Sequence, residues 1–204
     1  MNETPLGPDD RRRTLRAELR ARREALGPRE RMQAADGLAD HLGHLAEFLT
    51  DERVAGYWAV RGELSLHRVL PPLAARGQRF HLPVLGDGNS LGFAPWKNGD
   101  PVHPNRYGIP EPAVRPTPLL SPEMMQLVLV PLVAFDRRGN RLGSGAGYYD
   151  RSFEFLREGD RPREPLLVGI AYSFQEIDIL PREPWDVPLD FVCTERELIE
   201  CAPG

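Results

Sequence analysis

Apolar residues recur at helical spacing through the first fifty positions of the chain. Leu15 and Leu19 mark one face of a first segment, between arginines. A Gly-Pro break at positions 27–28 separates it from a second segment, whose apolar residues continue at intervals of three and four to Leu45. The spacing therefore predicts N-terminal helices over about residues 10–49.

Beyond this region the pattern changes to short apolar runs with the length of buried strands. These runs occupy positions 54–58, 79–84, 127–131, 166–171 and 191–193. A helical stretch over about 66–75 follows the first run, and a strand–helix–strand order favours parallel pairing. Prolines crowd positions 91–122, where we expect an edge hairpin or extended segment and then a long loop. The pattern indicates an α/β core over about 53–195, with a mostly parallel sheet and helices on both faces.

The length of 204 residues suits one domain, or at most two small ones. The net charge of −4 argues against a protein built mainly to coat nucleic acid. No apolar run reaches the ~20 residues of a membrane span, and the polar N-terminus has no signal-peptide core, so we expect a cytoplasmic protein with no membrane partner. Cys193 and Cys201 are expected to be free thiols rather than a disulfide, and a metal pair at His41 and His44 is disfavoured.

Lysine is almost absent, since the chain has one lysine, Lys97, and 25 arginines. A mechanism that needs a lysine elsewhere is therefore excluded. The run of arginines from position 11 to position 23 could form a basic helix that binds nucleic acid or nucleotide phosphates. The alternative is a solvated helix face, which charge runs usually form.

The segment at positions 136–150 carries alternating glycines just ahead of a predicted helix. Gly143, Gly145 and Gly147 would let backbone N–H groups approach a ligand, and Arg141 adds a cation with a planar donor fork. This pattern could form a polyphosphate cradle, although it matches neither the P-loop nor the GxGxxG motif. The alternative is a connection that merely turns a strand into a helix.

Further candidate ligand-binding residues are aromatic or acidic; some directly follow this loop and others lie in two other loops. Tyr148 and Tyr149 could stack on a planar ligand, or one ring could pack in the core while the other is exposed. Asp150 could hold Mg²⁺ against phosphate oxygens or stabilise the start of the helix. Asp186 lies in a proline-bounded loop, where spacing alone favours an ordinary turn. Glu63 follows the first predicted strand and could read a pterin- or guanine-like donor edge, or be a surface glutamate.

Taken in order, these segments resemble the 5-formyltetrahydrofolate cyclo-ligase family, also called methenyltetrahydrofolate synthetases. The motifs are RRTLR at 12–16, YWAVRGE at 57–63, YGIPEP at 107–112, PLVAFD at 131–136, GNRLGSGAGYYD at 139–150 and PWDVPLD at 184–190. The block at 139–150 is highly specific, whereas the others are weak alone and strong in this order.

The resemblance implies a single-domain, three-layer α/β/α fold over residues 1–204. It implies an ATP- and Mg²⁺-dependent enzyme that converts 5-formyltetrahydrofolate to 5,10-methenyltetrahydrofolate and releases ADP and phosphate. The γ-phosphoryl group would be transferred to the formyl oxygen, and N10 would then attack the activated carbon. These small molecules would be its partners, without nucleic acid, and it would be a monomer or homodimer. The alternative is a non-catalytic relative that binds nucleotide or RNA.

The same resemblance implies roles for individual residues. ATP would be bound by Arg12, Arg16, Arg141, Leu142, Gly143, Ser144, Gly145, Ala146, Gly147 and Tyr148. Folate would be bound by Trp58, Glu63, Gly145, Ala146, Gly147, Tyr148 and Tyr149. Arg141 and Tyr148 would be catalytic, and Asp150 and Asp186 would hold the metal, with Asp190 a less certain supporting acid.

Two positions depart from the pattern of the family. Arg12 stands where lysine is usual; arginine keeps the charge but is bulkier and always ionised. Ala146 stands where glycine or a basic residue is usual, and alanine would be strained if the position needs a positive φ. We expect these changes to affect rate and ATP affinity more than the fold.

Overall fold

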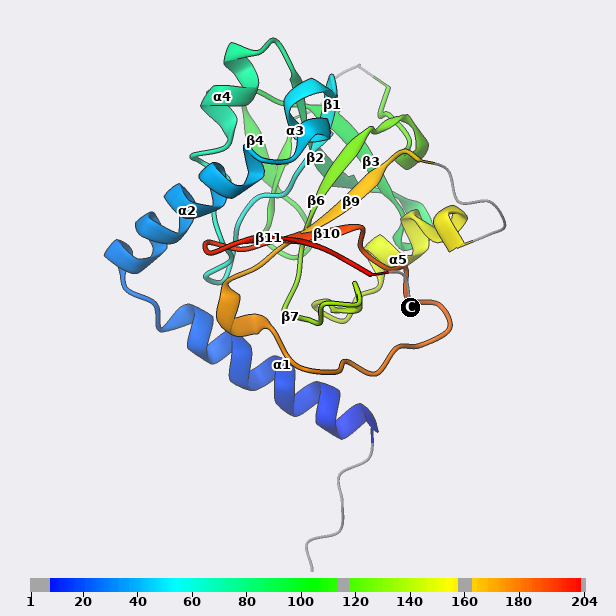
Figure 1. The fold of residues 1–204 in the computed structure, drawn as a ribbon. Coiled ribbons are helices and arrows are strands. Elements are labelled where there is room, and N and C mark those ends of the chain that lie inside the picture. Colours follow the sequence, from blue (N-terminus) through cyan, green and yellow to red (C-terminus); the bar gives the residue numbers. More distant parts are fainter. Residues whose placement is uncertain (1–7, 114–117, 158–162, 203–204) are drawn as a thin grey trace, which may run out of the picture.

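The computed structural model describes residues 8–113, 118–157 and 163–202, which form a central sheet flanked by helices (Figure 1). Seven strands pair in the order β11-β10-β9-β6-β1-β2-β3. Their bounds are β1 Arg53–Ala55, β2 Arg79–Leu85, β3 Leu91–Pro95, β6 Leu127–Pro131, β9 Leu166–Ile170, β10 Phe191–Cys193 and β11 Leu198–Glu200. Two antiparallel ribbons stand apart from this sheet: β4 (Val102–Pro104) with β5 (Pro110–Pro112), and β7 (Ala134–Phe135) with β8 (Arg141–Leu142).

The middle of the sheet is parallel, which confirms the prediction. In β1, Val54 lies beside Phe80 of β2 on one side and Leu127 of β6 on the other. The edge strands β3 and β11 are antiparallel to their neighbours. The pattern of the sequence predicts β3 as an edge segment, but it does not reveal β11, because three residues that include a glutamate carry too little periodicity.

The helices are α1 (Pro8–Glu24), α2 (Pro28–Leu42), α3 (Ala46–Thr50), α4 (Leu70–Ala75) and α5 (Tyr148–Ser152). Short 3₁₀ turns are η1 (Asp87–Asn89), η2 (Pro122–Met124), η3 (Glu154–Arg157) and η4 (Ser173–Gln175). The predicted N-terminal helices are therefore present. Figure 1 shows α1 below the sheet, where Leu19 packs with Val133 and Leu142 of the β7–β8 region.

The strands bury side chains on both of their faces, because successive residues point to opposite sides. On β6, Leu127 and Leu129 join the cluster that includes Leu38 of α2. Val128 of the same strand joins the cluster that includes Phe153, directly after α5. Helices α2, α3 and α4 thus cover one face of the sheet and α5 covers the other, which confirms the three-layer α/β/α fold.

Two predicted elements are shorter than expected, and the residues by which they are shorter lie in loops. The helix predicted over 66–75 begins only at Leu70, with the proline pair in its first turn, where a missing backbone N–H costs no helical hydrogen bond. The run predicted over 54–58 is a strand only to Ala55, and the chain then enters a long loop before α4.

Cys193 and Cys201 are buried free thiols, as predicted. Burial is the main cause that raises the pKa of Cys201, to about 12. Among the described helices, none is both long enough and apolar enough to cross a membrane.

Candidate active site

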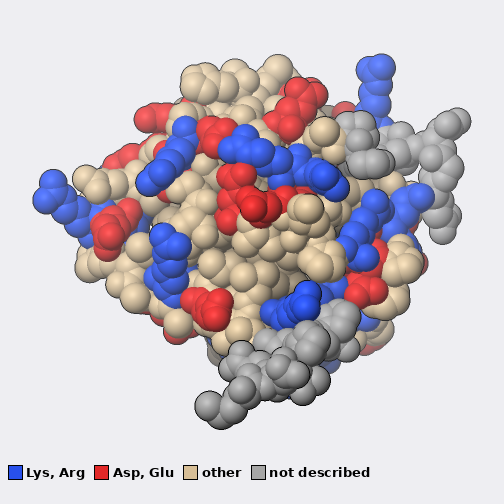
Figure 2. Space-filling model, turned by 60° about the horizontal axis from the view of Figure 1, so that its bottom comes forward, with Lys and Arg blue, Asp and Glu red and all other residues tan. Residues whose placement is uncertain are grey.

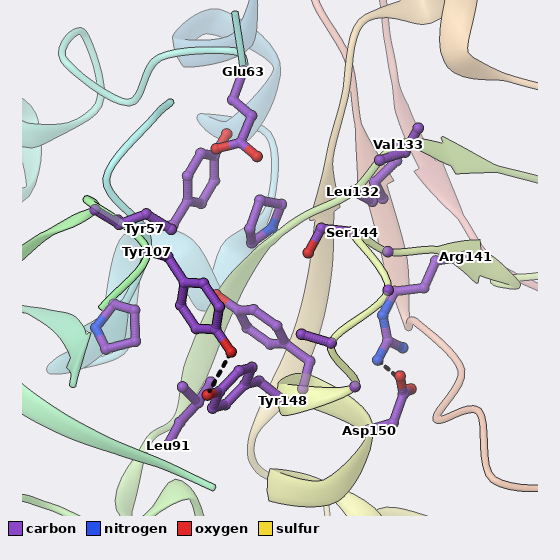
Figure 3. Close-up of a pocket in the computed structure, with 18 of the residues that line it drawn as sticks. Tyr57, Glu63, Leu91, Tyr107, Leu132, Val133, Arg141, Ser144, Tyr148 and Asp150 are labelled. Carbon is purple, nitrogen blue, oxygen red and sulfur yellow. Dashed lines mark hydrogen bonds and ion pairs between the residues drawn. The ribbon is translucent and has the colours of Figure 1, made fainter. Parts of the chain in front are cut away.

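A cavity of about 630 Å³ opens where the carboxyl ends of β1 and β6 meet α1 and the glycine-rich loop. The chain leaving β1 supplies Tyr57 and Trp58 to its lining, and the chain leaving β6 supplies Leu132. Ligands of open α/β sheets bind at this edge. Figure 3 shows Glu63 near Tyr57 on one side of the cavity and Asp150 on another.

The glycine-rich loop at residues 143–147 forms one wall of this cavity. Gly145 and Gly147 have left-handed φ angles of +106° and +69°. Two carbonyl oxygens of the loop accept hydrogen bonds from α1, one from Arg16 Nε at 3.0 Å and one from Arg20 Nη2 at 2.9 Å. Helix α1 therefore holds this loop in place.

Ala146 stands between the two left-handed glycines without sharing their backbone conformation. Among the described residues other than glycine, a positive φ occurs at Arg61 and Asn89. Alanine at position 146 is therefore not strained, and its methyl group is exposed.

Arg141 lies beneath the loop, with 4% of its side chain exposed. Its Nη2 lies 2.6 Å from Asp150 Oδ1, and its Nη1 donates to the carbonyl oxygen of Val187. The N–H of Val187 donates to the same Asp150 oxygen at 3.2 Å. Burial lowers the pKa of Arg141, while Asp150 and then Asp186 oppose that shift. Arg141 thereby joins Asp150 to the loop that carries Asp186.

Arg12 reaches the same acidic loop from α1. Its Nη1 lies 3.1 Å from Glu183 Oε1, and its Nη2 lies 3.5 Å from Asp186 Oδ2. The Nε of Arg12 is buried and has no hydrogen-bond partner among the described residues. A buried donor left without an acceptor costs free energy, so this nitrogen is placed to favour an incoming acceptor.

Aromatic rings form another part of the wall. Trp58 meets Trp96 edge to face, with ring centroids 5.5 Å apart. Tyr149 stacks on Phe153, with ring centroids 6.2 Å apart. Burial raises the pKa of Tyr149 and the charge of Glu63 adds to the rise, so this phenol stays protonated at neutral pH.

Tyr148 is fixed through its hydroxyl group. The oxygen accepts a hydrogen bond from Arg106 and lies 3.3 Å from the hydroxyl of Tyr107 (Figure 3). Arg106 also donates to Asn89 Oδ1 at 3.0 Å, which ties this contact to η1. Hydrogen bonding to Tyr107, and less strongly to Arg106, lowers the pKa of Tyr148.

Apart from the less certain Asp190, the structure brings the sequence-predicted site residues to this one cavity, with one exception. Those that line it are Arg12, Arg16, Trp58, Glu63, Arg141, Gly143, Ser144, Gly145, Ala146, Gly147, Tyr148, Tyr149, Asp150 and Asp186. The exception is Leu142, which is fully buried in the core with Leu19. Because neighbouring residues of a strand point to opposite faces, Arg141 and Leu142 cannot both face the cavity, and the Leu142 side chain points into the core.

Asp190, the uncertain metal residue, lies outside this lining. Its Oδ2 accepts a hydrogen bond from the N–H of Leu167 at 2.8 Å, which joins it to the start of β9. Its side chain therefore supports the sheet.

The lining also contains residues that were not predicted as site residues, among them Arg20, Arg23, Tyr107 and Trp185. For the two arginines a signal exists, because they follow Arg12 and Arg16 at helical spacing and so share one face of α1. Tyr107 lies in a proline-rich stretch, where no periodicity shows which side chains face inward.

Comparison with known proteins identifies the family. A model of the 5-formyltetrahydrofolate cyclo-ligase family matches residues 8–195. The chain is 33% identical to the 5-formyltetrahydrofolate cyclo-ligase of Haemophilus influenzae, over 88% of this chain and 95% of that protein. It is 32% identical to the Escherichia coli K12 protein of the same name, over 89% and 99% of the two chains.

Solved structures agree with these relatives. The 5,10-methenyltetrahydrofolate synthetase of Aquifex aeolicus superposes with a TM-score of 0.78 at 32% identity, covering 95% of this chain and 94% of that one. The Mycoplasma pneumoniae 5,10-methenyltetrahydrofolate synthetase superposes with a TM-score of 0.71 at 25% identity, covering 90% and 98%. With the fold, the cavity and the ordered motifs, these matches show that the chain belongs to the 5-formyltetrahydrofolate cyclo-ligase family.

Proposed function

We propose that the chain converts 5-formyltetrahydrofolate to 5,10-methenyltetrahydrofolate and consumes ATP, with ADP and phosphate as the other products. The observation that carries this proposal is the set of residues that line this cavity. Arginines and a glycine-rich loop lie on one part of its wall, and aromatic rings with a buried carboxylate lie on another. A polyphosphate and a planar heterocycle can thus meet in one cavity.

The phosphate side is the wall formed by α1 and the glycine-rich loop. Arg12 offers a buried Nε–H without an acceptor, and Arg16 lies beside the loop to which it donates. Positive charge held at fixed positions favours the charge that develops during phosphoryl transfer. We assign the triphosphate of ATP to this wall.

The carboxylates fit Mg²⁺, which prefers oxygen ligands and usually keeps several waters. Asp150 and Asp186 both line the cavity and are joined through Val187. In the part of the chain that the structure describes, no three His, Cys, Asp or Glu side chains form a complete metal cluster, so phosphate oxygens and water would complete the shell. Bound Mg²⁺ would neutralise phosphate charge. Arg141 and the Val187 N–H both bond Asp150 Oδ1 and so orient that carboxylate.

The folate side consists of Trp58, Tyr149 and Glu63. The rings provide apolar surface for a pterin, and the carboxylate can accept hydrogen bonds from its N–H groups. Tyr148 lies between this side and the loop, so we place the formyl group beside it. The formyl oxygen is a poor leaving group until it takes the γ-phosphoryl group; N10 then attacks the formyl carbon, and the C–O bond breaks as phosphate leaves.

Two observations weigh against the alternative of an RNA-binding relative. The arginines Arg12, Arg16 and Arg20 contact residues of the cavity wall. On the face shown in Figure 2, basic and acidic side chains are interspersed rather than gathered into one basic patch. The cytoplasmic location and the monomeric or homodimeric state remain predictions.

The test is to mix the purified protein with 5-formyltetrahydrofolate, ATP and Mg²⁺ and to follow the absorbance of methenyltetrahydrofolate. Reactions without ATP, without Mg²⁺ and without protein are the controls. We expect product only in the complete mixture, with one ADP formed per product. Folded protein that binds ATP but forms no product would refute the proposal and favour the non-catalytic alternative.

A further inference from the structure

A buried arginine at the end of α1 contacts the loop that carries Glu63. We propose that Arg23 is a positioning residue that holds the carboxylate of Glu63 in place and balances its charge, so that Glu63 can accept a hydrogen bond from the folate. This inference rests on the proposed function and adds a residue that the family motifs do not include.

Each nitrogen of the Arg23 guanidinium has its own partner. Nε donates to the carbonyl oxygen of Arg61 at 3.0 Å, and Nη1 donates to that of Leu132 at 3.2 Å. Nη2 lies 3.7 Å from Glu63 Oε1, and 3% of the Arg23 side chain is exposed. The two carbonyl groups are neutral, so Glu63 supplies the opposite charge that a buried guanidinium requires.

The backbone just before Glu63 is bent tightly against α1. Arg61 and Gly62 have left-handed φ angles of +48° and +73°. A Cβ at Gly62 would lie 2.8 Å from the carbonyl oxygen of Arg23, so the two segments touch. A left-handed conformation at a residue other than glycine persists only where its surroundings hold it. Here the hydrogen bond from Arg23 to the Arg61 carbonyl does so, and it thereby directs Glu63 toward the cavity.

The two oxygens of Glu63 have different environments. Oε2 accepts a hydrogen bond from the N–H of Val60 at 3.1 Å. Oε1 faces Arg23 at 3.7 Å, which is too long for a hydrogen bond. Arg23 therefore attracts Oε1 electrostatically and leaves it able to accept a donor from the ligand. Figure 3 shows this carboxylate directed to the cavity side.

The protonation state of Glu63 depends on its burial and on the charged groups around it. The groups that face it are the Val60 N–H, the guanidinium groups of Arg20, Arg23 and Arg61, and the phenols of Tyr57 and Tyr149. Burial raises the pKa of Glu63, and the Val60 hydrogen bond and then Arg23 are the largest opposing influences. Loss of the Arg23 charge would raise the pKa of Glu63 further, so ionisation would need a higher pH.

The test compares Arg23→Gln with Arg22→Gln, the same change one position earlier on α1. Arg22 lies over the ring of Phe174, and it is absent from the cavity lining. For Arg23→Gln we expect the KM for 5-formyltetrahydrofolate to rise about tenfold, which corresponds to ~1.4 kcal/mol. The KM for ATP should stay within about twofold. The acidic limb of the pH profile of kcat/KM for folate, which reports the ionisation of Glu63, should move to a pH about one unit higher. A loss of ~1.4 kcal/mol in the attraction between residue 23 and ionised Glu63 corresponds to one pKa unit.

Arg22→Gln should match the wild type in both KM values and in the pH profile. Arg23→Lys keeps the charge, so its acidic limb should stay near that of the wild type although its KM for folate rises. If Arg23→Gln does not fold, Arg23→Lys decides the case: a rise in the KM for folate alone supports the proposal, whereas no rise, or an equal rise for ATP, refutes it. A folded Arg23→Gln with an unmoved acidic limb also refutes it. A wild-type protein that forms no product would instead refute the proposed function.

Discussion

Replacing Asp150 by asparagine removes the charge that faces buried Arg141 and leaves the size of the side chain nearly unchanged. We therefore expect Asp150→Asn to change two measurements together. Turnover should fall, because the carboxylate is assigned to Mg²⁺. Stability should also fall, because Asp150 Oδ1 lies 2.6 Å from a guanidinium with 4% of its side chain exposed.

The size of the stability loss follows from the kind of hydrogen bond. A bond to a charged group contributes about 1.5–3 kcal/mol and a neutral one about 1 kcal/mol, so the exchange should cost about 0.5–2 kcal/mol. The Asp150 side chain is 26% exposed, which favours the lower half of that range. A chain of this length loses about 2–4 °C in Tm per kcal/mol. We expect a decrease in Tm of about 1–5 °C.

Thermal unfolding and the methenyltetrahydrofolate assay measure the two effects. Asp186→Asn is the matched control, because Asp186 is assigned to the same metal but lies 3.5 Å from an arginine that also pairs with Glu183. Both variants should lose about 10²-fold or more in kcat, the scale of losing one electrostatic contact to a transition state. Only Asp150→Asn should lose several degrees in Tm. Near-normal turnover of Asp150→Asn would remove this residue from the metal site, and an unchanged Tm would show that Arg141 does not depend on it.

Three further predictions use other contacts. Arg12→Ala should raise the KM for ATP about tenfold or more, as expected for loss of a charged hydrogen bond. Arg12→Lys should retain ATP use. Equal KM values for Arg12→Ala and the wild type would contradict the assignment of Arg12 to the phosphates. Gly62→Ala should lower the free energy of unfolding in urea by about 1–3 kcal/mol more than Gly77→Ala. Both glycines have left-handed φ angles, +73° and +75°, but a Cβ meets the Arg23 carbonyl at Gly62 and open space at Gly77. Equal losses for the two variants would show that the contact at Gly62 relaxes. Burial, assisted by nearby glutamates, raises the pKa of Asp51 to about 6, so ionisation of Asp51 destabilises the fold as the pH rises from about 4 through 6. Asp51→Asn should therefore have a higher Tm than the wild type at pH 7 but not at pH 4. A gain in Tm that is independent of pH would exclude ionisation of Asp51 as its cause.

The parallel core could be predicted because its strands are buried on both faces and leave continuous apolar runs, as at 127–131. The site could be predicted because its motifs follow the strand ends, where parallel sheets bind ligands. The sequence does not reveal short elements whose pairing is long-range. Strand β8 has two residues, so no pattern shows that Arg141 faces the cavity while Leu142 faces the core. Helical spacing places Arg23 on the same face of α1 as Arg12 and Arg16, but only the fold brings the loop at Arg61 against it.

Residues of helix α1 contact both sides of the cavity, which has a consequence for the energetics of ligand binding. Arg12 and Arg23 are eleven residues apart, or about 16 Å along a helix that rises 1.5 Å per residue. A helix moves as one body more readily than it stretches, so a shift of α1 on phosphate binding at Arg12 would also shift Arg23 relative to the Glu63 loop. ATP and folate would then each change the binding of the other by the same factor in both directions. In this chain α1 would act as a mechanical link between two substrates that need not touch before they react.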